Sequence, residues 1–248
     1  MGKIYSASKR SEKKYWKNSE ETTIDFQKSM SAKYADPIPM PLGYNRYQEI
    51  KSKLITRFPK ESIKTVMFTS TAHGNGSTFT AVSFATTLVR DFKLNVLLID
   101  ANLRSPDLHG MFNIENHRGL SYLLTQEEDK TFPLKKVGFG GLYLIPCGKN
   151  NSEPTKLFES ARFENTIKIL REKFDYVILD VPPVNRYAES IVIATKVDGV
   201  ILVIESDKTR RQVAIRAKQE MEKAGAKVLG VILNKRKHYI PEWIYKRL

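Results

Sequence analysis

Residues 65–80 hold the feature that most limits how this chain can fold. The apolar, β-branched run 65–71 is typical of a buried strand. A turn with two glycines, Gly74 and Gly76, follows it, and residues 78–89 are able to begin a helix. A strand, a glycine-rich loop and a helix in this order surround phosphate groups, because loop N–H groups turn inward and the helix N-terminus carries a partial positive charge. The stretch therefore predicts an α/β fold with an anion site at the end of this strand.

The loop departs from the usual phosphate-binding consensus at its most charged position. A P-loop normally ends in Gly-Lys followed by Ser or Thr, with the lysine on the β- and γ-phosphates and the hydroxyl on Mg²⁺. Here Ser77 occupies the lysine position and Thr78 the hydroxyl position. We therefore expect the scaffold of a nucleotide site without its main positive charge.

Two further apolar runs end in an aspartate. Asp100 follows the run 96–99, and Asp180 follows the run 176–179. Open α/β sheets place their ligands beside the carboxyl ends of the strands. Asp180 has the position of a Walker B acid, which binds Mg²⁺ directly or through water. The alternative interpretation is that each aspartate only caps its own loop.

Strands and helices alternate along the rest of the chain. This alternation predicts an α/β fold with a doubly wound, mostly parallel sheet and helices on both faces. We expect helices over residues 43–58, 119–124, 154–173, 188–195 and 209–224, and strands over residues 141–146, 199–205 and 227–234.

The composition divides the chain into three parts. Residues 1–42 are polar and basic and end in a proline-rich linker, which predicts a largely flexible extension. Residues 43–234 form the predicted P-loop NTPase-like domain, and residues 235–248 form a basic, aromatic tail.

The net charge of +14 is concentrated near the two ends. Residues 1–60 hold 13 basic and 6 acidic side chains, and residues 235–248 hold 5 basic and 1 acidic. Such an excess favours an anionic partner, which is a membrane surface, nucleic acid or an acidic protein segment, and an ordinary solvated surface explains it equally well. No RNA-binding signature accompanies the tail, so we do not expect nucleic acid.

Composition also excludes two classes of protein. No apolar run approaches the roughly 18–20 residues that a spanning helix needs. The single cysteine, Cys147, excludes an internal disulfide framework and a cysteine metal cluster, and its position predicts a core thiol. Because no secretory signal is present, we expect the chain to remain in the cytoplasm.

Together these segments resemble the bacterial tyrosine kinase (BY-kinase) family, the cytoplasmic autokinases of capsule and exopolysaccharide export, and more widely the partition and septum-site ATPases. Residues 72–78 are similar to the family's P-loop, residues 100–104 to its second motif, Asp-x-Asp-x-Arg, and residues 177–183 to its Walker B motif. Residues 154–160 and 230–234 are similar to two further family segments. The resemblance covers the chain from about residue 43 to its end.

The resemblance implies a site for ATP or ADP with Mg²⁺. The nucleotide-binding positions are Gly74, Asn75, Gly76, Ser77, Thr78, Phe79 and Asn234. The metal positions are Thr78, Asp100 and Asp180, and the catalytic positions are Asp100, Asn102 and Asp180. In an intact member, one acid of the second motif would act as the base toward a tyrosine hydroxyl.

The chain departs from the family at both charged motifs. Ser77 replaces the lysine, and Asn102 replaces the second acid and cannot accept a proton. Losing one preorganised group of this kind typically costs about 10²–10³ in rate. A basic group from elsewhere would offset the loss, and the candidates are Arg104 and the pair Arg210-Arg211.

Two other family features are also altered. The oligomerisation segment corresponds to residues 45–53, where Gln48 and Lys51 replace arginines. The C-terminal tyrosine cluster is reduced to Tyr239 and Tyr245.

Three functions remain open at this point. The first is a degenerate subunit that regulates exopolysaccharide or capsule biosynthesis and export, peripheral to the inner face of the membrane. It would dock on the cytoplasmic segment of a membrane chain-length or export protein, as a homo-oligomer or paired with an intact kinase. The second is an active ATP-dependent tyrosine autokinase of the same pathway. The third is a partition-type ATPase that binds membrane or nucleoid through its basic ends.

Overall fold

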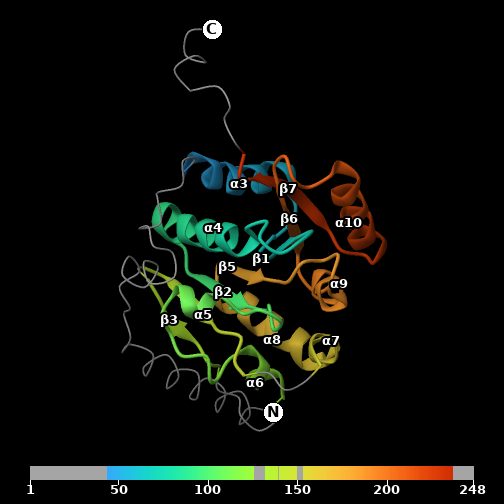
Figure 1. The fold of residues 1–248 in the computed structure, drawn as a ribbon. Coiled ribbons are helices and arrows are strands. Elements are labelled where there is room, and N and C mark those ends of the chain that lie inside the picture. The colour runs from blue at the N-terminus through green and yellow to red at the C-terminus, as the bar shows by residue number, and fades with distance from the viewer. Residues whose placement is uncertain (1–43, 126–131, 139, 150–152, 237–248) are drawn as a thin grey trace.

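The computed structural model describes residues 44–125, 132–138, 140–149 and 153–236 (Figure 1). The predicted extension over residues 1–42 lies outside the described residues, as does the aromatic part of the tail with Tyr239 and Tyr245. Every described helix is too short or too polar to cross a bilayer.

A seven-stranded sheet forms the centre of the described chain, with the order β3-β4-β2-β5-β1-β6-β7 (Figure 1). All neighbouring strands are parallel except β3 and β4, which are antiparallel. This arrangement confirms the predicted mostly parallel sheet. The strands are β1 (Thr65–Ser70), β2 (Val96–Asp100), β3 (Lys135–Lys136), β4 (Leu142–Ile145), β5 (Tyr176–Asp180), β6 (Gly199–Glu205) and β7 (Val228–Asn234).

Helices cover both faces of the sheet, because each central strand carries apolar side chains on both sides. In β1, Val66 and Phe68 pack into one hydrophobic core and Met67 into the other, and all three are fully buried. The Val66 side is covered by α3 (Tyr44–Arg57), α4 (Ser77–Phe92) and α5 (Leu108–Met111). The Met67 side is covered by α6 (Leu120–Thr125), α7 (Pro154–Glu159), α8 (Ala161–Lys173), α9 (Ala188–Ala194) and α10 (Arg211–Lys223).

One predicted helix is wrong in its continuity. Residues 154–173 form two helices, α7 and α8, that meet at Ser160. The backbone of Ser160 is extended, and its hydroxyl accepts the N–H of Phe163 at 3.2 Å, which is the geometry of a helix N-cap. The apolar spacing continues across the break, so hydrophobic periodicity alone predicts one continuous helix.

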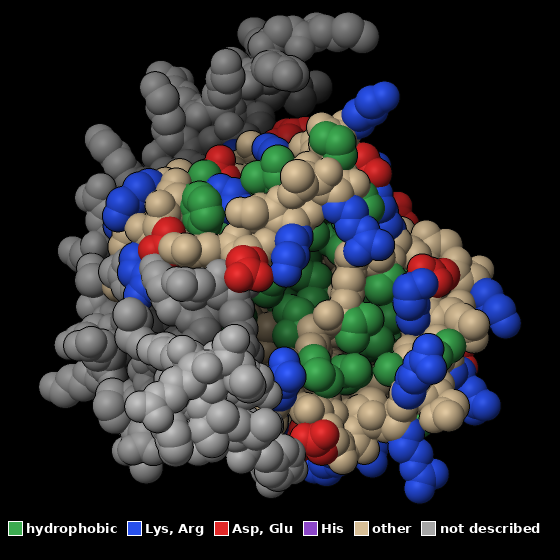
Figure 2. Space-filling view, turned by 90° about the horizontal axis from the view of Figure 1, so that it is seen from above, with side chains coloured by type: hydrophobic (Ala, Val, Ile, Leu, Met, Phe, Trp, Pro, Cys, Tyr) green, Lys and Arg blue, Asp and Glu red, His purple; other side chains and the backbone are tan. Residues whose placement is uncertain are grey.

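The strand β7 forms one edge of the sheet and is only partly covered. Val231 and Leu233 are each about half exposed, and Val213 and Ile215 of the neighbouring α10 are also exposed. Figure 2 views the molecule from the top of Figure 1, where α3, β7 and α10 lie, and shows a hollow with hydrophobic side chains surrounded by lysines and arginines.

Candidate nucleotide site

A cavity of about 460 Å³ lies at the carboxyl edge of the sheet. Its walls come from the segments that follow β1, β2 and β5 and from the end of β7. Ligands of open α/β sheets bind at this edge, where the strand order reverses. Seven of the predicted site residues line the cavity: Gly74, Gly76, Ser77, Thr78, Phe79, Asn102 and Asn234. The other three, Asn75, Asp100 and Asp180, are buried and do not line it.

The phosphate loop has the backbone conformation that its glycines were predicted to supply. Gly74 and Gly76 have φ values of +81° and +89°, which residues with a side chain seldom adopt. A Cβ atom on Gly76 would lie 2.3 Å from the Nδ2 atom of Asn234. Ser77 and Thr78 are the first residues of α4, so the cavity adjoins the positive end of a helix.

Asn75 holds the loop together from the inside. Its Oδ1 atom accepts the hydroxyl of Thr71 at 3.1 Å and the N–H of Ala72 at 3.0 Å. Its backbone carbonyl accepts the Nδ2 atom of Asn234 at 2.9 Å, which ties the end of β7 to the loop. The Asn75 side chain therefore supports the loop, and Asn234 is placed both to line the cavity and to fix its shape.

Asp180 is a buried acid at the carboxyl end of β5. Its side chain is 1% exposed, and neither carboxylate oxygen has a hydrogen-bond partner that meets geometric criteria among the described residues. Burial raises the pKa of Asp180 well above its usual range, and Asp100 raises it further, although the nearby Thr78 hydroxyl lowers it. An unpaired buried carboxylate is costly. A carboxylate beside a hydroxyl suits a hard cation such as Mg²⁺, so the residues present fit that ion.

Asp100 has both of its oxygens occupied by its own loop. Oδ1 accepts the N–H of Asn102 at 3.3 Å, and Oδ2 accepts the N–H of Leu108 at 3.1 Å. Burial raises the pKa of Asp100 to about 7. Asp100 thus caps the loop after β2, and its carboxyl group lies next to Asp180. Its predicted metal-binding and catalytic roles stay predictions.

Asn102 lines the cavity in the position of the second acid. Its Oδ1 atom accepts the N–H of Ser105 at 3.1 Å, and the side chain is nearly buried. An amide keeps this turn intact, as a carboxylate would, but it has no basic oxygen to take a proton.

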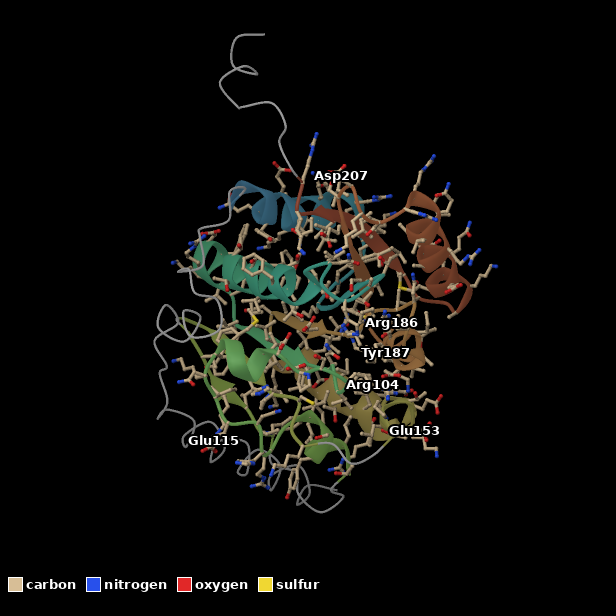
Figure 3. The ribbon with its side chains drawn as sticks, in the orientation of Figure 1. Arg104, Glu115, Glu153, Arg186, Tyr187 and Asp207 are labelled. Carbon is tan, nitrogen blue, oxygen red and sulfur yellow. The ribbon has the colours of Figure 1, made fainter. Side chains whose placement is uncertain are left out.

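None of the three basic residues proposed to replace the lysine lines the cavity. Arg104 donates from Nε to Glu189 at 2.8 Å and lies 5.4 Å from the ring of Tyr187. Figure 3 shows Arg104 and Tyr187 close together, with Arg186 beside them. Arg210 and Arg211 lie exposed at the start of α10.

The basic residue at the cavity is Lys235, which the sequence interpretation assigned to the tail. Its Nζ atom donates to the carbonyl of Gly74 at 2.6 Å. The sequence could have indicated this location, because Lys235 directly follows Asn234, a predicted nucleotide-binding residue.

A second contact that the sequence did not indicate joins His73 to Tyr187. The His73 Nε2 and Tyr187 hydroxyl lie 3.3 Å apart, and His73 lines the cavity. The two residues are 114 positions apart, so no local pattern would have paired them.

Gln48 and Lys51, in the segment that resembles the family's oligomerisation segment, contact residues of their own chain. Gln48 donates from Nε2 to Asp91 at 3.1 Å. The Nζ atom of Lys51 lies 3.6 Å from the centre of the Phe92 ring, and burial lowers the pKa of Lys51. Both side chains therefore attach α3 to the end of α4.

Comparison with known proteins gives the same assignment at two levels. A family model described as ParA, NUBPL iron-transfer P-loop NTPase, matches residues 62–244. The tyrosine-protein kinase CpsD of Streptococcus agalactiae is 33% identical over 181 residues, which cover 72% of this chain and 78% of CpsD. The tyrosine-protein kinase YwqD of Bacillus subtilis is 30% identical over 199 residues, which cover 80% of this chain and 84% of YwqD.

A solved structure shows the same fold. The crystal structure of the chimerical protein CapA2B2 aligns with a TM-score of 0.76 and 25% identity, covering 87% of this chain and 93% of that one. With the phosphate loop, the paired strand-end aspartates and these relatives in agreement, the chain belongs to the ParA-like P-loop NTPases and, among them, to the bacterial tyrosine kinase family.

Proposed function

We propose that this chain is a nucleotide-binding BY-kinase subunit with weak or absent phosphoryl transfer, which regulates capsule or exopolysaccharide biosynthesis and export. The observation that carries the proposal is Asp180, whose buried carboxylate oxygens accept no hydrogen bond from the described residues, next to Thr78 at the glycine-rich loop. A cation bound beside Asp180 would offset the cost of its buried charge, which supports a site that binds nucleotide with a metal ion.

The roles of the site residues follow from their positions. The loop from Gly74 to Thr78 would bind the phosphates through its backbone N–H groups, with Phe79 and Asn234 completing the wall. Thr78 and Asp180 would hold Mg²⁺, and Asp100 would add negative charge beside them. When bound, Mg²⁺ supplies positive charge to the phosphate oxygens.

The site lacks two groups that phosphoryl transfer normally uses. Ser77 carries no charge toward the transferring group, and Asn102 offers no base. Each loss is of the kind that typically reduces a rate by about 10²–10³. Binding and release of nucleotide need neither group, so the chain would act as a nucleotide-responsive regulator.

The family suggests where this regulator works. Its relatives are named tyrosine kinases, and one solved relative is titled as the chimera CapA2B2. We propose that the chain docks on the cytoplasmic segment of a membrane export protein, at the inner face of the membrane. The active-autokinase alternative has one observation in its favour, which is the presence of Lys235 at the cavity.

Calorimetric titration with Mg-ATP and Mg-ADP tests the proposal, together with detection of phosphotyrosine after incubation with ATP. We expect saturable binding of both nucleotides and little or no phosphotyrosine. Abundant phosphotyrosine on the wild-type chain would select the active kinase. Absence of binding to the wild-type chain, with binding restored in Ser77→Lys, would show a scaffold that no longer responds to nucleotide.

A further inference from the structure

Three aspartates lie in or beside the cavity, and a basic side chain there would favour the binding of a polyphosphate. Asp107 lines the cavity, and Asp100 and Asp180 are buried beside it. Ser77 adds no positive charge where the consensus has a lysine. Of the described residues that line the cavity, Lys235 is the one lysine or arginine.

Lys235 is held against the phosphate loop at its backbone and at its side chain. Its N–H donates to the Oδ1 atom of Asn234 at 2.9 Å, and Asn234 in turn donates to the carbonyl of Asn75. Its Nζ atom donates to the carbonyl of Gly74 and lies 3.5 Å from the Oε2 atom of Glu205. The φ of Lys235 is +54°, which is uncommon for a residue with a side chain. This turn of the backbone leaves the lysine at the loop immediately after β7 ends.

We propose that Lys235 supplies the charge that the loop lost at Ser77, by binding the phosphates of a nucleoside diphosphate or triphosphate in the cavity. The inference rests on the proposed nucleotide binding and names the residue that makes it feasible. A lysine has a flexible four-carbon stem, so its ammonium group can leave the Gly74 carbonyl for an adjacent ligand. The exchange is favourable because a charged phosphate oxygen is a stronger acceptor than a neutral carbonyl.

Glu205, the acid that lies beside Lys235, has other partners in the structure. The Oε2 atom of Glu205 also lies 3.4 Å from the Nζ atom of Lys208 and 3.5 Å from the Nδ2 atom of Asn75. Glu205 therefore keeps a cation and an amide when Lys235 turns toward a ligand. Lys208 shares the same acid and does not line the cavity, which makes it a matched control.

The experiment compares Mg-ADP titrations of the wild type, Lys235→Met and Lys208→Met. We expect Lys235→Met to weaken ADP binding about tenfold or more, the usual scale for one charge-assisted hydrogen bond. Lys208→Met should weaken ADP binding much less than Lys235→Met does, because Lys208 pairs with Glu205 and does not line the cavity. Ser77→Lys introduced into Lys235→Met should recover most of the loss, because it returns a lysine to the consensus position. Lys235→Asn serves as a second variant, since asparagine tolerates a positive φ better than most residues.

Other outcomes overturn the inference in distinguishable ways. Wild-type affinity in both Lys235 variants would leave nucleotide binding standing and remove Lys235 from it. An equal loss for adenosine, measured by competition, would show that Lys235 contacts the nucleoside and not the phosphates. A wild-type chain that binds no nucleotide would overturn the proposed function together with this inference.

Discussion

Asp100 and Asp180 are register partners at the carboxyl ends of the neighbouring parallel strands β2 and β5. Both are almost completely buried, and Asp100 raises the cost of a negative charge on Asp180. Backbone N–H groups donate to both carboxylate oxygens of Asp100, whereas neither carboxylate oxygen of Asp180 accepts a hydrogen bond from the described residues. The two neighbouring acids therefore differ, because the loop backbone favours a charge on Asp100 and burial disfavours one on Asp180.

Replacing Asp180 by asparagine should stabilise the protein when metal is chelated. The change replaces a buried acid, whose negative charge is disfavoured by burial and by Asp100, with a neutral amide, so the free energy of unfolding should rise by about 1–3 kcal/mol. Urea unfolding in EDTA at neutral pH measures it, with the exposed Asp207→Asn as a control that should change little. In excess Mg²⁺ the order should reverse, because only the wild type gains stability by binding the ion. A destabilised Asp180→Asn variant in EDTA would contradict the interpretation.

The two loop glycines should respond differently to alanine. Both Gly74→Ala and Gly76→Ala force a side chain into a positive φ, which costs about 1–2 kcal/mol. Only at Gly76 would the new Cβ meet another group, Asn234, whereas at Gly74 nothing lies within 4 Å. We expect Gly76→Ala to lose about 1 kcal/mol more in chemical unfolding, because the Asn234 to Asn75 hydrogen bond must break.

A double-mutant comparison isolates this contact. In an Asn234→Ala background the asparagine side chain is gone, so the difference between Gly76→Ala and Gly74→Ala should disappear. A difference that persists there would mean that the two glycines differ for another reason.

Restoring both lost groups should create measurable phosphoryl transfer. Ser77→Lys returns the charge aimed at the phosphates, and Asn102→Asp returns a proton acceptor that can still accept the N–H of Ser105. We expect the double variant to incorporate radiolabelled phosphate at least about 10²-fold faster than the wild type. Each single variant should gain less. Adding Asp180→Asn to the double variant should abolish the gain, and labelling that survives would point to a contaminating kinase.

Asp198, which does not line the cavity, should make the free energy of unfolding fall at acid pH. Burial raises the pKa of Asp198, but hydrogen bonds from the backbone N–H groups of Thr65 and Lys64 and from Arg171 outweigh it, so the net pKa lies below the usual value. A depressed carboxyl pKa stabilises the fold above the unfolded-state value, near 4, and this contribution is lost as the pH falls through the folded-state pKa.

The variant Asp198→Asn measures this contribution. It should lower the free energy of unfolding by about 1–3 kcal/mol at pH 7. The gap from the wild type should close as the pH falls below about 4, where the wild-type carboxyl becomes protonated. Glu49→Gln is the control, because its ion pair with Lys53 is exposed and should contribute less than about 1 kcal/mol at any pH. A gap that is constant with pH would mean that the charge of Asp198 is unimportant.

The architecture was predictable because its signals are local. Each apolar run that ends in Asp100 or Asp180 is buried on both faces, which only a covered parallel sheet provides. Parallel strands bring their carboxyl ends to one edge, so the three motifs were bound to meet there. The break at Ser160 was not predicted, because the apolar pattern continues across it and only one side-chain hydrogen bond marks the start of the second helix.

By itself, then, the sequence determined the sheet, the phosphate loop and the serine at the consensus lysine position. Only the tertiary structure decided which basic residue lies at the cavity. Arg104, the last residue of the second motif, pairs with Glu189, whereas Lys235, 161 positions from Gly74, donates a hydrogen bond to the loop. The physical reason is that a local sequence pattern determines where a strand ends. Which groups surround the residues at that end depends on the order of the strands in the sheet, and those strands are distant in sequence. The adjacency of β7, β6 and β1, which brings Asn234 and Lys235 to the phosphate loop, appears only once the chain is folded.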